Sequence, residues 1–129
     1  MKTYGVRMGM TFQVTDVKKP LMSVKRIVEK GNYVVFGPNP EDNYIENRDY
    51  GDRVMLRREG GSFLMDAKFV GGGMTKITID SGAEENVCPK EWGEMFKLKE
   101  PERKQTFRNA SGGKIEHYGC RDVLLVSPF

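Results

Sequence analysis

Residues 76–89 read KITIDSGAEENVCP, and they place one acidic residue, Asp80, directly after two alternating isoleucines. The alternation predicts a β-strand, and the small residues Ser81, Gly82 and Ala83 predict a tight turn after it. Asp80 is then either a polar residue that opens an Asx turn or a carboxylate presented at the end of a strand. Because D-S-G is common by chance, the tripeptide alone favours the turn.

The rest of the chain predicts a single β-rich domain. Its 129 residues are 38% apolar and 30% charged, which is typical of one folded globular domain. Short periodic segments separated by frequent turn residues favour a barrel or a sandwich. We expect strands at 10–17, 33–36 (buried), 53–56, 62–70, 76–79 and 123–126, with a hairpin turn at REGGS between the third and the fourth.

Two segments are expected to form short helices. Residues 20–31 place apolar side chains on one helical face, with Pro20 at the start and Gly31 at the end. Residues 89–96 begin with a proline at a favourable first position and offer Trp92 and Phe96 to the core. His117 and Trp92 are interpreted as a polar strand residue and a core aromatic.

Charge and composition argue against several classes of function. The net charge of +3 is spread among acids, which does not suit a nucleic-acid-binding face. The two cysteines, Cys88 and Cys120, form no zinc spacing with His117, so we expect free, partly buried thiols and no metal or cofactor. No apolar run reaches the length of a membrane span and no signal peptide is recognised, so we expect a cytoplasmic, non-membrane protein.

Two glycine-rich segments stand out. Residues 106–119 contain two arms around N-A-S-G-G, which predicts a hairpin with a glycine-rich tip that can cover an extended substrate or can simply lie on the surface. Residues 70–76, VGGGMTK, are either a loop between strands or a linker that joins two segments.

Taken together, these segments resemble parts of a known family. The strand with D-S-G-A, the hairpin about 25 residues later and the apolar strand after it resemble the N-terminal portion of retropepsin-like aspartic proteases, which process retroviral and retrotransposon polyproteins. Residues 10–38 resemble the C-terminal portion of the same family, with F-x-V-x-D-V, a Pro-Leu turn, a short helix, a glycine and the strand VVF. PLMSV replaces the family's Ile-Leu-Gly turn, and residues 39–70 fit only as an added hairpin.

The two portions occur in exchanged order, which is the pattern of a circular permutation. Residues 1–70 would be the family's C-terminal half and residues 76–129 its N-terminal half, within one domain. Residues 71–75 are then interpreted as a linker, which suggests an engineered chain. The segments at the two chain ends are interpreted as the two sides of a cut loop.

The resemblance implies an all-β, closed six-stranded acid-protease barrel (related to double-psi barrels) with one or two short helices. It implies an aspartic endopeptidase that cleaves peptides or polyproteins as a homodimer, with Asp80 catalytic and Ser81, Gly82 and Ala83 supporting its loop. The flap tip would consist of Asn109, Ala110, Ser111, Gly112 and Gly113. Glu84 and Glu85 are interpreted as exposed turn charges. The alternatives are an inactive protease-fold module for dimerisation or peptide binding and, less favoured, a nucleic-acid-binding barrel.

Overall fold

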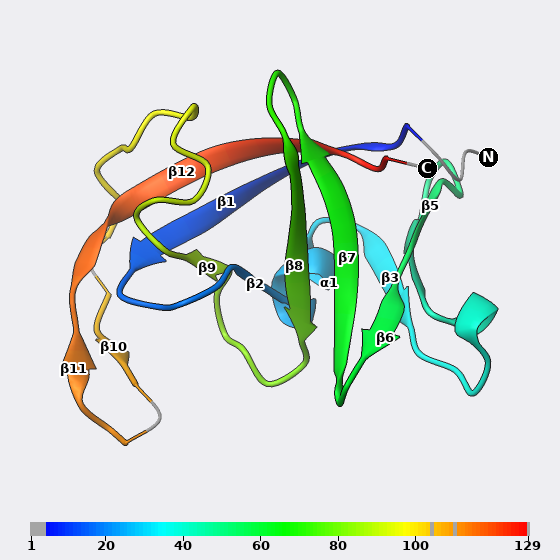
Figure 1. The fold of residues 1–129 in the computed structure, drawn as a ribbon, viewed down its shortest axis with the longest axis horizontal. Coiled ribbons are helices and arrows are strands. Elements are labelled where there is room, and N and C mark those ends of the chain that lie inside the picture. Colours follow the sequence, from blue (N-terminus) through cyan, green and yellow to red (C-terminus); the bar gives the residue numbers. More distant parts are fainter. Residues whose placement is uncertain (1–4, 104, 110, 129) are drawn as a thin grey trace.

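Six strands close into a barrel in the computed structural model, which describes residues 5–103, 105–109 and 111–128 (Figure 1). The sheet order is β12-β1-β9-β2-β8-β7, and pairing of β12 with β7 closes it. The expected all-β barrel is therefore present. The strands are β1 (Arg7–Thr15), β2 (Leu21–Ser23), β7 (Ser62–Phe69), β8 (Met74–Asp80), β9 (Val87–Cys88) and β12 (His117–Val126).

Alternating apolar residues on these strands fill the interior. Met65, Ala67 and Phe69 on β7 are buried, as their period of two predicted, and Phe12 and Val14 on β1 are fully buried. Burying a side chain of this size stabilises the fold by about 1.5–3 kcal/mol. The core also contains Ile77 and Ile79 from β8 and Val123 and Leu125 from β12.

A second, three-stranded sheet lies beside the barrel. It consists of β3 (Asn32–Val35), β4 (Tyr44–Asn47) and β5 (Arg53–Met55), with the short 3-10 helix η1 (Pro40–Asp42) between β3 and β4. The prediction that 33–36 is a buried strand is wrong, because β3 is an edge strand in which Tyr33 is exposed and Val34 and Val35 are only half-buried. The expected turn at REGGS forms, but the strand it joins to β7 is β6 (Arg57–Glu59); residues 53–55, expected as that partner, form β5 and pair with β4 instead.

Only one α-helix forms in the described residues, α1 (Val24–Glu29). It begins four residues after Pro20, because residues 21–23 pair with β8 and β9 as β2 before the chain turns. The side chain of Ser23 caps its first turn by accepting a hydrogen bond from the N–H of Arg26. Gly31 follows the end of the helix with φ of +90°, as expected for a residue that ends a helix.

The second expected helix is absent, and residues 89–96 form successive turns. Gly93 has φ of +72°, which lies outside helical geometry and interrupts any helix there. Trp92 nevertheless packs against Phe12 and Phe69, with ring centroids 4.8 and 5.0 Å away. Its interpretation as a core aromatic is confirmed, and His117 lies in β12 as a strand residue.

The triple glycine forms the turn between β7 and β8. The N–H of Phe69 donates to the carbonyl of Gly73 at 3.0 Å, and Gly71 has φ of +80°. Met74 and Thr75, placed in the linker on sequence grounds, already belong to β8 because they continue its pairing with β7. Locally, then, this segment is a loop between adjacent strands.

The two ends of the described chain lie side by side (Figure 1). Arg7 pairs with Val126 at the start of the β1–β12 ladder, and the N–H of Val6 donates to the Oγ of Ser127 at 2.8 Å. Within the described residues, no helix has the length and apolar character needed to cross a membrane.

Candidate functional site

Asp80 is the last residue of β8, beside Ser23 of the parallel strand β2. Its Oδ1 accepts a hydrogen bond from the N–H of Gly82 at 2.8 Å, so the Asx turn considered from the sequence is formed. This bond fixes the carboxylate, while Ser81 and Gly82 are exposed and Ala83 is half-buried. A small-residue turn of this kind leaves the half-buried carboxyl of Asp80 approachable from outside the barrel.

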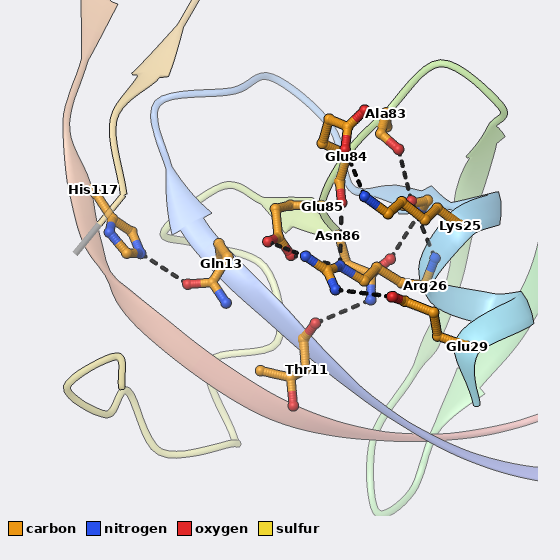
Figure 2. Close-up of polar contacts among 11 residues, drawn as sticks. Thr11, Gln13, Lys25, Arg26, Glu29, Ala83, Glu84, Glu85, Asn86 and His117 are labelled. Atoms are coloured by element: carbon orange, nitrogen blue, oxygen red, sulfur yellow. Dashed lines mark hydrogen bonds and ion pairs between the residues drawn. The ribbon is translucent and has the colours of Figure 1, made fainter. Parts of the chain in front are cut away.

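The loop after Asp80 is held in place by the start of α1 (Figure 2). The fully buried Ser23 donates its hydroxyl to the carbonyl of Ala83 at 2.7 Å, and the Nε of Arg26 donates to the carbonyl of Glu84 at 3.1 Å. Both contacts go to main-chain carbonyls, so they fix the path of the loop. The contact of Ala83 with α1 is thus made by its carbonyl.

The two glutamates of the loop pair with the same helix. Arg26 Nη2 lies 2.5 Å from Glu85 Oε2 and its Nη1 lies 2.8 Å from Glu29 Oε1. The hydrogen bonds that Arg26 donates, above all the one to Glu85, raise the pKa of Arg26. Lys25 Nζ lies 3.0 Å from Glu84 and lowers the pKa of that carboxyl. The interpretation of Glu84 as an exposed turn charge holds. Glu85 differs, because its side chain is only 20% exposed and Arg26 binds it.

Asn86 closes the loop and is the residue that sequence reasoning missed. Its side chain is buried, its Oδ1 accepts from the N–H of Ser23 at 2.8 Å, and its Nδ2 donates to the carbonyl of Thr11 at 3.1 Å. Its own carbonyl accepts from the N–H of Gln13 at 2.8 Å. Nothing in the local sequence signals this role, whereas the preference of serine for helix N-caps could have identified Ser23.

The expected glycine-tipped hairpin is confirmed. It consists of β10 (Phe107–Arg108) paired with β11 (Lys114–Ile115), and Asn109 Oδ1 accepts from the N–H groups of Ser111 and Gly113 at 3.1 and 2.8 Å. Gly112 has φ of +87°, which a glycine adopts without strain. Ala110 lies outside the described residues. Among the described residues of the tip, the hydrogen bonds join Arg108 and Asn109 to residues 111–113, and none reaches the Asp80 loop.

The base of this hairpin is attached to the end of β1. Thr15 donates its hydroxyl to the carbonyl of Glu116 at 2.5 Å, and His117 Nε2 lies 2.9 Å from Gln13 Oε1. The ring of Phe107 meets His117 edge-on, with centroids 5.1 Å apart. In Figure 1 the hairpin tip and the loop after β8 project from the same end of the barrel.

The remaining candidate ligands are not gathered into a site. In the part of the chain that the structure describes, no three histidine, cysteine or acidic side chains cluster as metal ligands would. Cys88 and Cys120 are free thiols and both are buried, as expected. Burial raises the pKa of the Cys88 thiol to about 12, which makes it a poor nucleophile near neutral pH.

The arrangement is therefore a single carboxylate in a fixed, small-residue turn at the end of a barrel strand, with a hairpin at the same end of the barrel. Comparisons with protein-family models, with curated proteins and with solved structures find no match for this chain.

Proposed function

We propose that the chain is a retropepsin-like aspartic endopeptidase. The observation that carries the proposal is the Asp80 turn, in which the carboxylate accepts the N–H of Gly82 while the loop is anchored from behind by Ser23 and Arg26. Because these contacts hold the loop from the side of α1, the opposite side of the turn consists of the small, exposed residues Ser81 and Gly82. A second copy of the same turn can approach it without a steric barrier from long side chains.

Two such carboxylates would act as one acid–base unit. Two carboxyl groups about 3 Å apart share a single proton, because both cannot ionise at that distance. The ionised carboxylate takes a proton from a water molecule held between the pair, and the water attacks the peptide carbonyl. The protonated carboxyl stabilises the carbonyl oxygen as charge develops. The C–N bond then breaks while the leaving nitrogen takes a proton from the pair, which releases an amine and a carboxylic acid. Cleavage is expected to be fastest at mildly acidic pH, where the pair holds one proton.

The second carboxylate must come from another chain. Asp16 lies just beyond β1, and its Oδ1 accepts the hydroxyl of Tyr118 at 2.7 Å. Asp66 pairs with Arg57 at 2.6 Å on β7. Neither lies in a turn like that of Asp80. A homodimer brings Asp80 to its own copy when the two-fold axis passes through the Asp80 turn, because a residue on the axis of an isologous interface meets the same residue of the partner.

The hairpin and the chain ends fit the same proposal. The β10–β11 hairpin would act as the flap that covers a peptide bound at Asp80, with Asn109, Ser111, Gly112 and Gly113 at its tip together with Ala110. Antiparallel pairing of Arg7 with Val126 places β1 and β12 side by side, as the exchanged order of the two resembling portions requires. The β7–β8 turn would then be the new connection between the exchanged halves.

Replacing Asp80 by asparagine tests the function. We expect Asp80→Asn to abolish cleavage of a mixed peptide library, while Asp49→Asn, the same chemical change at an exposed residue far along the chain, leaves cleavage unchanged. Circular dichroism confirms that both variants are folded. Retention of cleavage by Asp80→Asn would exclude the mechanism.

Mixing tests the shared dyad. Adding Asp80→Asn protein to an equal amount of wild type should reduce cleavage to about half per wild-type chain, because random pairing produces inactive mixed dimers. Adding the Asp49→Asn protein should not reduce it. Sedimentation at the assay concentration provides the complementary measurement, and a strict monomer would favour a non-catalytic module with this fold.

A further inference from the structure

A groove runs along the face of β8 that carries Asp80. Lys76, Thr78 and Asp80 share this face because successive strand residues alternate, while Ile77 and Ile79 point into the core. The groove has a volume of about 510 Å³, and Lys76 and Thr78 line it. Thr78, the lining residue nearest to Asp80 along β8, is two residues or roughly 7 Å of strand away from it.

The walls of this β8 groove are fixed by contacts to β8 itself. On one side the loop before β2 approaches, where the carbonyl of Pro20 accepts the N–H of Thr78 at 3.3 Å. On the other side Trp92 donates its indole N–H to the hydroxyl of Thr75 at 2.9 Å. Leu64 of the neighbouring strand β7 adds apolar surface. The groove is thus partly apolar and built by three separate segments.

Its charges are unevenly compensated. Lys76 lies 3.4 Å from Glu59, whose pKa is lowered by hydrogen bonds from Arg57 and then from Lys76. Two further lysines, Lys18 and Lys19, also line the groove, and both are exposed.

Within the described residues, neither of these two ammonium groups contacts a carboxylate, and Glu91 is the one acidic wall residue that remains unpaired. After the pairing of Lys76 with Glu59, two cations face one anion. The groove therefore presents an excess of positive charge beside Asp80.

We propose that the β8 groove binds an acidic side chain of the peptide substrate and that Lys18 and Lys19 select it. The inference rests on the proposed protease function. An extended peptide advances about 3.3 Å per residue, so a substrate whose scissile bond lies at Asp80 places a side chain two or three residues away in the groove. A glutamate there gains the two ammonium groups as partners, whereas a glutamine of the same shape does not.

The expected selectivity is modest because the lysines are exposed. Solvent-exposed ion pairs are individually weak, so the two lysines together should favour glutamate over glutamine by about five- to tenfold in kcat/KM at low salt. The preference should shrink as salt is raised toward 1 M, where charges are screened beyond roughly 3 Å. A shape-based preference would not respond to salt in this way.

The test uses two peptide series that differ only by Glu or Gln at the second and third positions from the scissile bond. Charge reversal by Lys18→Glu with Lys19→Glu should abolish or invert the Glu/Gln ratio. The matched control, Lys68→Glu with Lys97→Glu, changes the net charge equally at exposed lysines that do not line the groove, and it should preserve the ratio. Equal ratios in wild type and in the groove variant would overturn the inference, as would an equal effect of the control.

Binding separates this inference from the proposed function. Fluorescence anisotropy of the labelled, uncleaved peptides is measured on the Asp80→Asn protein and on the same protein carrying the two reversals. Tighter binding of the Glu peptides that is lost on reversal supports the groove even if wild type cleaves nothing, in which case only the protease proposal fails. Cleavage of both series without a lysine-dependent preference leaves the protease proposal intact and removes this one.

Discussion

Replacing Asn86 by alanine removes the side-chain bonds that hold the far end of the Asp80 loop. The Oδ1 of Asn86 is the acceptor for the N–H of Ser23, and its Nδ2 is the donor to the carbonyl of Thr11. Asn86 is only 4% exposed and Ser23 is fully buried. The alanine variant therefore leaves one buried donor and one acceptor without a protein partner.

The magnitude follows from how far water can replace each bond. An unsatisfied buried group costs about 1–3 kcal/mol, and the N–H of Ser23 should lie near the upper end because its residue is inaccessible to solvent. The carbonyl of Thr11 belongs to an exposed residue, so it should lie near the lower end. We expect a loss of about 2–4 kcal/mol in the free energy of unfolding, or roughly 8–16 °C in Tm for a chain of this length.

Urea unfolding followed by the fluorescence of the single tryptophan, Trp92, measures this loss. Asn109→Ala is the matched control, because its side chain also accepts backbone N–H groups but does so in an exposed turn where water replaces it. The control should lose less than about 1 kcal/mol. If Asn86→Ala loses no more than Asn109→Ala, Asn86 does not fix the loop.

Three further predictions concern β12. Gly119→Ala should destabilise the fold strongly, by more than about 2 kcal/mol in urea unfolding, since φ is +143° and a Cβ would lie 2.4 Å from the carbonyl oxygen of Lys99. Arg121→Met should be neutral or stabilising by about 1–2 kcal/mol in the same assay, because Nε and Nη1 of this buried arginine have no partner in the described residues and only Nη2 reaches the carbonyl of Lys90; a loss above about 2 kcal/mol would contradict this. Asp122→Asn should remove a small stabilisation, under about 1 kcal/mol, that depends on pH. Lys99 lowers the pKa of Asp122, so the stabilisation is present above the unfolded-state pKa of about 4 and is lost as pH falls through the lower folded-state value; a difference between variant and wild type that grows in acid would refute it.

Much of the barrel could be predicted because its strands carry local patterns. The alternation in residues 62–70 identified the buried face of β7, and the glycines around 60 and 112 marked two hairpins that form. The errors came where tertiary context overrides a local preference. Residues 21–23 have a helical pattern yet pair with Asp80's strand, and residues 89–96 break at Gly93.

Of the candidate site, too, only the features that depend on neighbouring residues could be predicted from the sequence. The position of Asp80 at the end of a strand and its Asx turn followed from the sequence, because the residues involved are adjacent. Ser23, Arg26 and Asn86 as its supports did not follow. The contacts that Ser23 and Arg26 make with the loop, including the one with Asn86, join residues separated by 58 to 63 positions. No local pattern encodes such pairs.

The sequence by itself determined which residues alternate, where the chain turns and where one carboxylate follows a strand among small neighbours, because backbone preference and side-chain alternation act over a few residues. Only the tertiary structure decided that β12 pairs with β7 to close the barrel, that α1 forms hydrogen bonds with the Asp80 loop, and that Lys18 and Lys19 line the same groove as Lys76. Those outcomes depend on which surfaces pack together to exclude water, and packing is a property of the whole chain.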